Sequence, residues 1–296
     1  MNTVARGFVL LAIFGLSAAY LPATERMYCF QNVMKNVAEG GGVVHVNGLT
    51  VEVKPIPDPD VPGFMTCQAT IRNSDGKTIF NNTDWGMEID PITGRDVNGD
   101  GIPDAVLVSF SGGAHCCSTY HIVSLGENPG LIAEFGDRAT ASFEDLNGNG
   151  KTEILIRDGG FDEGFGLSHP FSPFPLLIVQ LDGAKFHDVG SRFWRVYEKE
   201  IQRNYAKLKD ENLRQFLKSN PTEIHDSQDY LDTEFRILAI VLDYLYAGRP
   251  QEAHKMLGKL WPPEYQNGTW EEMARGYCSG LRATLKVEIN TICKKD

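Results

Sequence analysis

The chain has 296 residues, of which 39 are acidic and 28 basic, so its formal net charge at pH 7 is −11. Nucleic-acid binding depends on clustered lysine and arginine that release counterions from phosphates, and this charge balance argues against it. The length allows one large core or two modest ones. The composition therefore favours a globular protein that does not bind nucleic acid.

The first 19 residues are typical of a secretory signal peptide. Arg6 supplies the positive charge, residues 8–14 form an apolar run, and residues 17–19 offer a cleavage site of small side chains. This run is too short to span a membrane, with an uncleaved anchor as the alternative, and no later segment approaches a spanning length. We expect a secreted or periplasmic protein with no transmembrane domain after cleavage.

Four stretches of the chain alternate apolar and polar residues around a turn, as β-hairpins do. Asn47-Gly48, the strongest short turn signal, lies within the hairpin predicted for residues 43–53. The other hairpins are predicted for residues 66–80, 120–135 and 176–187. These last three hairpins, with the loops between them, indicate a repeating unit of roughly fifty residues.

Oxygen-bearing side chains alternate around glycines in the segment Asp96-Val-Asn-Gly-Asp-Gly-Ile-Pro-Asp104, and the pattern returns in Asp145-Leu-Asn-Gly-Asn-Gly-Lys-Thr-Glu153. Calcium takes six to eight oxygen ligands at about 2.3–2.6 Å, which such a wrap of backbone can supply. The alternative is a pair of polar β-turns, since the same residue types favour turns. An EF-hand is excluded, because its twelfth position needs a glutamate and here holds Leu107 and Ile156.

A loop of this kind that leads into an apolar strand resembles the FG-GAP (integrin-type propeller) repeat and the related VCBS repeat, over roughly residues 60–190. The resemblance implies a Ca²⁺ cofactor bound by the Ile102 and Lys151 carbonyls and by side chains. The implied side-chain ligands are Asp96, Asn98, Asp100 and Asp104 in one loop, and Asp145, Asn147, Asn149 and Glu153 in the other. Binding is expected to be weaker at the second loop, which has two carboxylates against three.

The expected fold class is α+β with two domains. Residues 25–190 are predicted to form an all-β repeat domain, propeller-like or sandwich-like, because three modules are too few for a closed propeller. Residues 191–296 are predicted to form a small α-helical domain. Its predicted helices are a long one from Phe193 to Leu213, then residues 235–246 and 252–260, and a fourth from Trp270 with a capping box of Thr269 and Glu272.

Six cysteines suit an oxidising compartment, but their spacing leaves the pairing open. Cys116 and Cys117 either join each other or each find a distant partner. Cys278 and Cys293 can pair only if the chain turns between them, because a continuous helix would hold them roughly 22 Å apart.

The segment Ser111-Gly-Gly-Ala-His-Cys-Cys-Ser-Thr-Tyr-His121 gathers residue types used in catalysis and metal binding. The segment resembles segments of uncharacterised exported bacterial proteins with FG-GAP-like repeats, and that resemblance implies no reaction. We favour structural disulfides here. The alternative is an exported thiol- or metal-dependent enzyme or redox protein that uses His115, Cys116, Cys117 and His121.

No other catalytic signature is present, and Gly159–His169 is predicted to be a surface loop, not an acid pair for glycoside hydrolysis. We therefore expect a non-enzymatic, exported calcium-binding module with structural calcium. It would serve a protein-interaction or cell-envelope role with a protein partner that the sequence does not identify. In a further alternative the helical half carries the function and the β half displays it.

Overall fold

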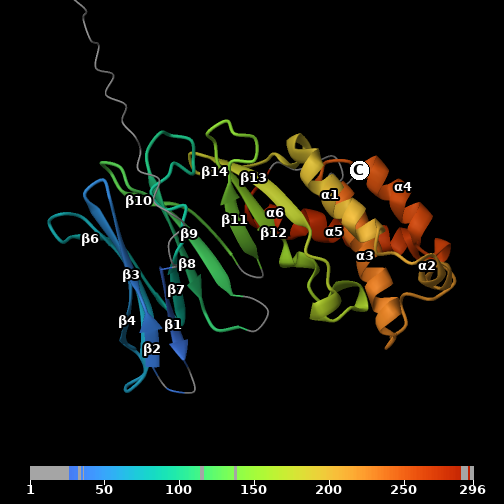
Figure 1. Cartoon of the computed structure of the whole chain (residues 1–296), viewed down its shortest axis with the longest axis horizontal. Coiled ribbons are helices and arrows are strands. Elements are labelled where there is room, and N and C mark those ends of the chain that lie inside the picture. The colour runs from blue at the N-terminus through green and yellow to red at the C-terminus, as the bar shows by residue number, and fades with distance from the viewer. Residues whose placement is uncertain are drawn as a thin grey trace, which may run out of the picture.

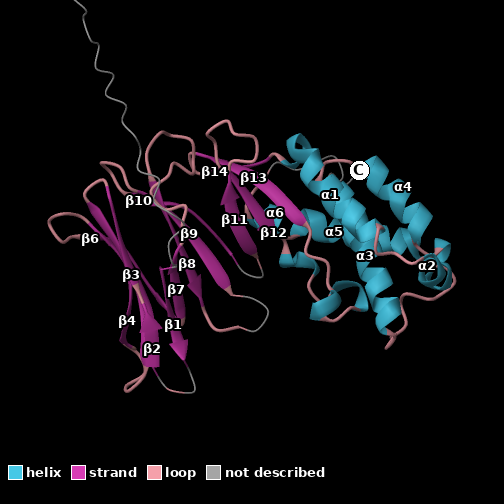
Figure 2. Cartoon of the chain, in the orientation of Figure 1, coloured by secondary structure: helices cyan, strands magenta, loops and turns pink. Residues whose placement is uncertain are grey.

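The computed structural model describes residues 27–32, 35, 37–113, 117–136, 139–287 and 293. The predicted signal peptide at residues 1–19 lies outside these residues, and so do His115 and Cys116. Strands come first along the chain and the α-helices follow them (Figure 1). Figure 2 shows the two kinds of element gathered at opposite ends of the molecule. The expected α+β fold class is therefore confirmed.

The strands form three antiparallel sheets. The central sheet has the order β10-β9-β8-β7-β1-β2, the outer sheet β3-β4-β5-β6 and the helix-side sheet β11-β12-β13-β14. The strands are β1 (Met27–Asn32), β2 (Val37–Gly40), β3 (Gly42–Val46), β4 (Leu49–Pro57), β5 (Met65–Arg72), β6 (Thr78–Asp84), β7 (Gly86–Ile89), β8 (Asp104–Phe110), β9 (Ser118–Ser124), β10 (Gly130–Gly136), β11 (Thr140–Glu144), β12 (Glu153–Arg157), β13 (Leu176–Asp182) and β14 (Lys185–Asp188).

All four predicted hairpins form, as β3–β4, β5–β6, β9–β10 and β13–β14. The first of them turns at Asn47 and Gly48, which have φ of 50° and 74°. A type I′ turn requires positive φ at both of its central residues, and asparagine followed by glycine is the pair that tolerates it best. The turn residues therefore predicted the strand pairing correctly.

Two of the sheets contain the same four-strand module. In the first module β7 leads through residues 90–103 into β8, β9 and β10, and in the second β11 leads through residues 145–152 into β12, β13 and β14. Each predicted calcium loop thus lies between the first and second strands of a module. The hairpin β5–β6 belongs to the outer sheet instead, so only two modules form among the described residues.

The sheets are stacked and do not close into a propeller. Along β8, Ala105 and Leu107 pack against the outer sheet, while Val106 and Val108 face the helix-side sheet. Successive residues of a strand point to opposite faces, so this continuous apolar run is buried on both sides. Two modules cannot form a ring, and the remaining faces are covered by the outer sheet and by helices.

The α-helices of the described chain lie on one side of the helix-side sheet (Figure 1). Helix α3 contacts β13, and α2 and α4 pack on α3. None of the helices in the described part of the chain is long and apolar enough to cross a membrane. The helices are α1 (Trp194–Tyr205), α2 (Asp210–Phe216), α3 (Gln228–Tyr246), α4 (Pro250–Leu260), α5 (Gln266–Ser279) and α6 (Leu281–Thr284).

The single long helix predicted from Phe193 to Leu213 is wrong. The backbone tightens after α1, where Lys207 and Leu208 donate to carbonyls three residues earlier, and Lys209 is extended. The apolar spacing continues across this break, because Leu208 before it and Leu213 after it both pack on the same core. A periodic pattern therefore continued across two helices that meet at a turn.

The capping box predicted from Thr269 and Glu272 is also wrong. Helix α5 begins at Gln266, so Thr269 lies inside it and donates its hydroxyl to the Tyr265 carbonyl. Glu272 instead accepts the backbone N–H of Phe165, which belongs to the segment after β12. A tertiary contact therefore occupies the side chain that a cap would have used.

One hydrophobic core joins the helix-side sheet to the helices, and a second lies between the central and outer sheets. The first core runs across the predicted domain boundary at residue 190. Tyr197 on α1 donates to the Leu176 carbonyl of β13 at 3.0 Å, and Tyr246 on α3 donates to Asp158 Oδ2 at 2.6 Å. The helical part therefore packs directly on the second module.

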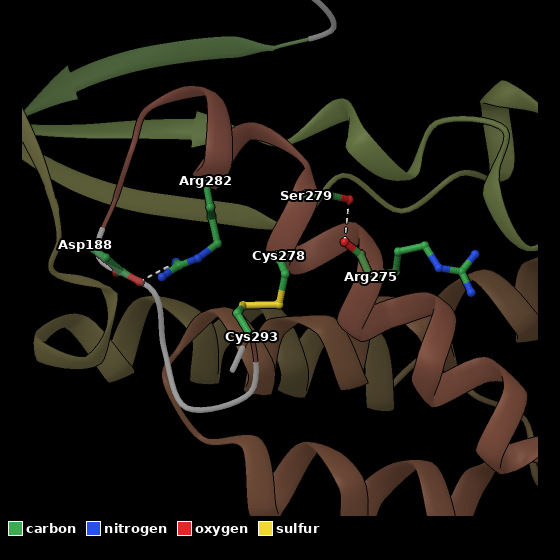
Figure 3. The surroundings of a disulfide bond; sticks show 6 residues. All are labelled: Asp188, Arg275, Cys278, Ser279, Arg282 and Cys293. Carbon is green, nitrogen blue, oxygen red and sulfur yellow. Dashed lines mark hydrogen bonds and ion pairs between the residues drawn. A yellow bond between two sulfur atoms is a disulfide. The ribbon is translucent and has the colours of Figure 1, made fainter. Parts of the chain in front are cut away.

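Two disulfides tie the described chain together. Cys29–Cys67 links β1 of the central sheet to β5 of the outer sheet, and Cys278–Cys293 has a Cα–Cα distance of 5.4 Å. The second bridge forms because α5 ends at Ser279 and the chain turns into α6, as its prediction required. Figure 3 shows this bridge beside the ion pair between Arg282 and Asp188, which fastens α6 to the end of β14. Such bridges are typical of proteins that fold in an oxidising compartment.

The buried acid Glu234 on α3 makes stability depend on pH. Its side chain is 3 % exposed, and Oε1 has no hydrogen-bond partner in the described structure. Burial raises the pKa of this carboxyl from 4.5 to about 8. The folded-state pKa lies above the unfolded value, so stability is fully present below about pH 4.5 and is lost as pH rises to about 8.

We predict that Glu234→Gln removes the loss of folding stability between about pH 4.5 and about pH 8. The free energy of unfolding of the variant relative to the wild type should rise by roughly 1–4 kcal/mol from about pH 5 to about pH 8.5. Urea unfolding at the two pH values measures it, with Glu211→Gln, an exposed acid on α2, as the control. A difference that stays constant with pH would contradict the prediction.

Candidate calcium loops

The two predicted loops connect equivalent strands of the two modules. The first loop (residues 96–104) joins β7 to β8, and the second loop (residues 145–153) joins β11 to β12. The last residue of each loop, Asp104 or Glu153, is also the first residue of a core strand, and both side chains are fully buried. Each closing carboxylate is therefore held where the loop enters the core.

The first residue of each loop organises the backbone in the same way. Asp96 accepts hydrogen bonds from the N–H groups of Gly99 and Gly101, both at 2.7 Å. Asp145 accepts from Gly148 at 2.7 Å and from Gly150 at 2.8 Å. These backbone donors, above all Gly150, hold the pKa of Asp145 below its usual value. Both loops are thus wrapped around their leading carboxylate.

A further hydrogen bond also corresponds between the loops. Ile102 N–H donates to Asp100 Oδ1, and Lys151 N–H donates to Asn149 Oδ1, both at 2.8 Å. The four loop glycines have φ between 73° and 82°, the left-handed region that side chains with a Cβ rarely adopt. The alternation of Asp, Asn and Gly therefore encodes one backbone path twice.

Asp104 is the one closing carboxylate with an unused oxygen. Its Oδ2 accepts the N–H of Val97 at 2.8 Å, but its buried Oδ1 has no hydrogen-bond partner among the described residues. Burial raises the pKa of Asp104 to about 7, and the nearby Asp100 and Asp96 act in the same direction. A buried, unpartnered carboxylate oxygen is costly, and a cation would supply the missing partner.

Glu153 in the second loop is satisfied by protein groups alone. Its Oε2 accepts the N–H of Leu146 at 2.8 Å, and its Oε1 accepts the side-chain amide of Gln180 at 2.7 Å. Gln180 comes from β13, so the neighbouring strand provides the donor that Asp104 lacks. The two loops share a backbone path and differ at this carboxylate.

The other predicted ligands are placed on the loops but do not converge. Among the residues that the structure describes, no group of three or more His, Cys, Asp and Glu side chains is gathered as metal ligands. Asp96 is turned towards backbone N–H groups, and Asn98 Nδ2 donates to Asp100 Oδ2 at 3.1 Å. In the second loop Asn147 Oδ1 accepts from the Asn149 N–H. The side chains thus satisfy one another and the backbone.

The two loops lie next to each other across the modules. Thr152 Oγ1 donates to the Asp96 carbonyl at 3.2 Å, and the Gly183 N–H donates to the Asn98 carbonyl at 3.2 Å. A pocket of about 690 Å³ lies where they meet, and Arg192 and Arg282 are among the residues that line it. The sequence does not mark these arginines as pocket residues, because they lie outside the loops and only the fold brings them there.

In the segment from Ser111 to His121, the described residues Cys117 and His121 are held by a disulfide and by side-chain contacts. Cys117 is disulfide-bonded and has φ of 94°. His121 is 6 % exposed, and its Nδ1 lies 2.8 Å from Glu134 Oε2. On its other side Nε2 lies 3.3 Å from Ser109 Oγ. A disulfide sulfur is not a thiolate, so this state of Cys117 offers no nucleophile.

The segment Gly159–His169 is not the surface loop that the sequence predicted. Phe161 is 3 % exposed and packs against Tyr246 of α3 with ring centroids 6.4 Å apart. Asp162 is also buried and lies 2.7 Å from His169 Nδ1. The many glycines and acids suggested a solvated loop, but the phenylalanines fix it against the helices.

Comparison with known protein families found no family model that matches this chain, and comparisons with curated proteins and with solved structures found no match. The resemblance of the loops to FG-GAP and VCBS repeats stays a prediction that depends on the loops themselves.

We predict that Glu153→Gln destabilises the protein by about 1–3 kcal/mol, because one of its two satisfied oxygens becomes an amide that faces a donor. Chemical unfolding in a chelator measures the loss without any contribution from bound metal. Glu144→Gln on the exposed side of β11 is the control and should change the free energy of unfolding by no more than about 0.5 kcal/mol. Equal losses in the two variants would contradict the role of Glu153.

Proposed function

We propose that the chain is an exported module of FG-GAP or VCBS type whose first loop holds a structural Ca²⁺. The observation that carries this proposal is the buried Asp104 Oδ1 that lacks a partner. The residues proposed to hold the ion are Asp96, Asn98, Asp100, the Ile102 carbonyl and Asp104. These are oxygen donors, the type that calcium prefers, and three of them are carboxylates.

The second loop is the weaker candidate. Its proposed ligands are Asp145, Asn147, Asn149, the Lys151 carbonyl and Glu153, which include two carboxylates. Glu153 already has a donor on each oxygen, so binding there would have to displace protein hydrogen bonds. Fewer charges and a satisfied carboxylate both favour a lower affinity than at the first loop.

The proposed role is binding of a protein partner outside the cytoplasm, in the secreted or periplasmic compartment. The two disulfides support an oxidising environment, and the four-strand modules support the resemblance to blades of a propeller-like repeat. Calcium at the first loop would then stabilise the β domain that presents such a surface. Extracellular modules bind calcium with dissociation constants of about 10⁻⁴–10⁻³ M, within reach of a loop with three carboxylates.

We predict that calcium binds the chelator-stripped, disulfide-intact protein and raises its stability. Calcium at about 100 times the dissociation constant should add about 2.7 kcal/mol to the free energy of unfolding. Calorimetric titration measures the binding, and melting curves at both end points measure the stabilisation. Magnesium serves as the control ion, because it demands near-octahedral geometry and dehydrates reluctantly.

The variant Asp104→Asn tests whether the Asp104 carboxylate binds the metal or has only a structural role. It should match or exceed the wild type in chelator, because the buried charge is gone, and it should gain little or nothing from calcium. Asp145→Asn, the same aspartate-to-asparagine change at the leading residue of the second loop, should keep most of the gain. No binding to the wild type, or an equal calcium gain in Asp104→Asn, would refute the first loop as a calcium site.

A further inference from the structure

A pocket on the helical side of the molecule is distinct from the calcium loops. It has a volume of about 410 Å³ and lies between the segment that follows β12 and the helices α1 and α3. Its apolar wall includes the rings of Phe174 and Phe235 and three prolines, and Asp243 also lines it. We call it the Asp243 pocket. Its size and mixed lining are typical of sites for small molecules.

Asp243 is a buried acid that no residue of the described chain satisfies by a hydrogen bond. It interrupts an apolar run on α3, and the residue is only 4 % exposed. Its carboxyl receives no hydrogen bond from any described residue. Burial raises the pKa of Asp243 to about 8, although Arg157 and Arg203 act in the opposite direction. At neutral pH the carboxyl therefore keeps its proton and is a hydrogen-bond donor aimed into the pocket.

His169 also lines the pocket and is held in a fixed orientation. Asp162, with a side chain that is 2 % exposed, lies 2.7 Å from His169 Nδ1. The imidazole also packs edge-on against the Phe174 ring, with centroids 5.5 Å apart. A carboxylate behind a histidine sets the direction of the ring, which is the arrangement used where a histidine must meet a ligand at a defined angle.

The acids around the pocket face groups other than Arg157. Glu200 is paired with Arg203, and Asp162 faces His169, while Asp243 is neutral. Arg157 is half-buried and has no carboxylate partner among the ion pairs of the described chain; its Nη1 donates only to the Phe174 carbonyl, at 3.3 Å. Guanidinium and a protonated carboxyl both donate hydrogen bonds, so the matching ligand is an acceptor with negative charge.

We propose that the Asp243 pocket binds a small organic monocarboxylate, whose carboxylate meets Arg157 and Asp243 and whose apolar body lies against Phe174 and Phe235. An ammonium ligand fits worse, because Arg157 would repel it. An uncharged ligand would leave Arg157 without an anion. None of the lining residues belongs to the two loops, so the proposal does not rest on calcium binding.

The test is calorimetric titration of the full, disulfide-intact protein, with calcium present throughout, using benzoate and butanoate as probes. Benzyl alcohol and benzylamine have the ring of benzoate without its carboxylate and are the matched comparison. We expect one or both carboxylates to bind, and benzyl alcohol and benzylamine to bind at least about tenfold more weakly than benzoate, because they lose the charge-assisted hydrogen bonds. Absence of binding by both carboxylates, or preference for benzylamine, would overturn the proposal.

Variants locate the binding in this pocket. Arg157→Gln should weaken benzoate about tenfold or more, and Asp243→Asn, which keeps the size and stays uncharged, should weaken it by a smaller factor. Asp229→Asn, an exposed change on the same helix, should leave binding unaltered. Melting curves check that each variant folds. If Arg157→Gln folds and binds benzoate with unchanged affinity, the binding lies elsewhere and the site is refuted. If Arg157→Gln does not fold, unchanged affinity in Asp243→Asn has the same meaning.

Discussion

The carboxylate that closes each loop is the constraint on which the β part depends. Asp104 and Glu153 are each the first residue of a strand that is buried in the core, and each accepts the backbone N–H of the second residue of its own loop. This hydrogen bond fixes where the loop ends and where the strand begins. Because side chains alternate along a strand, a shift by one residue would turn the apolar face of β8 or β12 to the wrong side.

The difference between the two loops follows from their neighbours. Glu153 is one carbon longer than aspartate, and its Oε1 reaches the amide of Gln180 on the adjacent strand. Asp104 has no such donor and keeps one oxygen without a partner. The same backbone path can therefore produce a loop that is complete in itself or one that needs a cation. Motif matching alone does not distinguish these, because the deciding residue lies on another strand.

The sequence predicted the local structure well and the tertiary arrangement poorly. Turn residues such as Asn47-Gly48 set the hairpins, and the loop glycines set the repeated loops, since both depend on backbone conformation within a few residues. The break between α1 and α2 was missed because the apolar spacing continues across it. The assignment of β5–β6 to a separate sheet was also missed, since pairing between distant strands leaves no local trace.

The Asp243 pocket was missed for a similar reason, although one signal was present. Asp243 is the only acid in the apolar run of residues 237–246, and a lone charge in such a run on a buried helix needs either a partner or a ligand. Its neighbours in the pocket come from the segment after β12 and from α1, and only the fold brings them together. A sequence pattern can mark such a residue but cannot show what surrounds it.

One short strand connects the two candidate sites. β12 begins with Glu153, which closes the second loop, and ends with Arg157, which lines the Asp243 pocket. It lies within the helix-side sheet, whose face belongs to the same core as α3 and α5. Arg282 and Asp188 join α6 to β14 at the edge of that sheet, and Tyr246 bonds Asp158 directly after β12. The helical part is therefore held in place by the second module, so the strand that fixes the loop also positions the charged wall of the pocket.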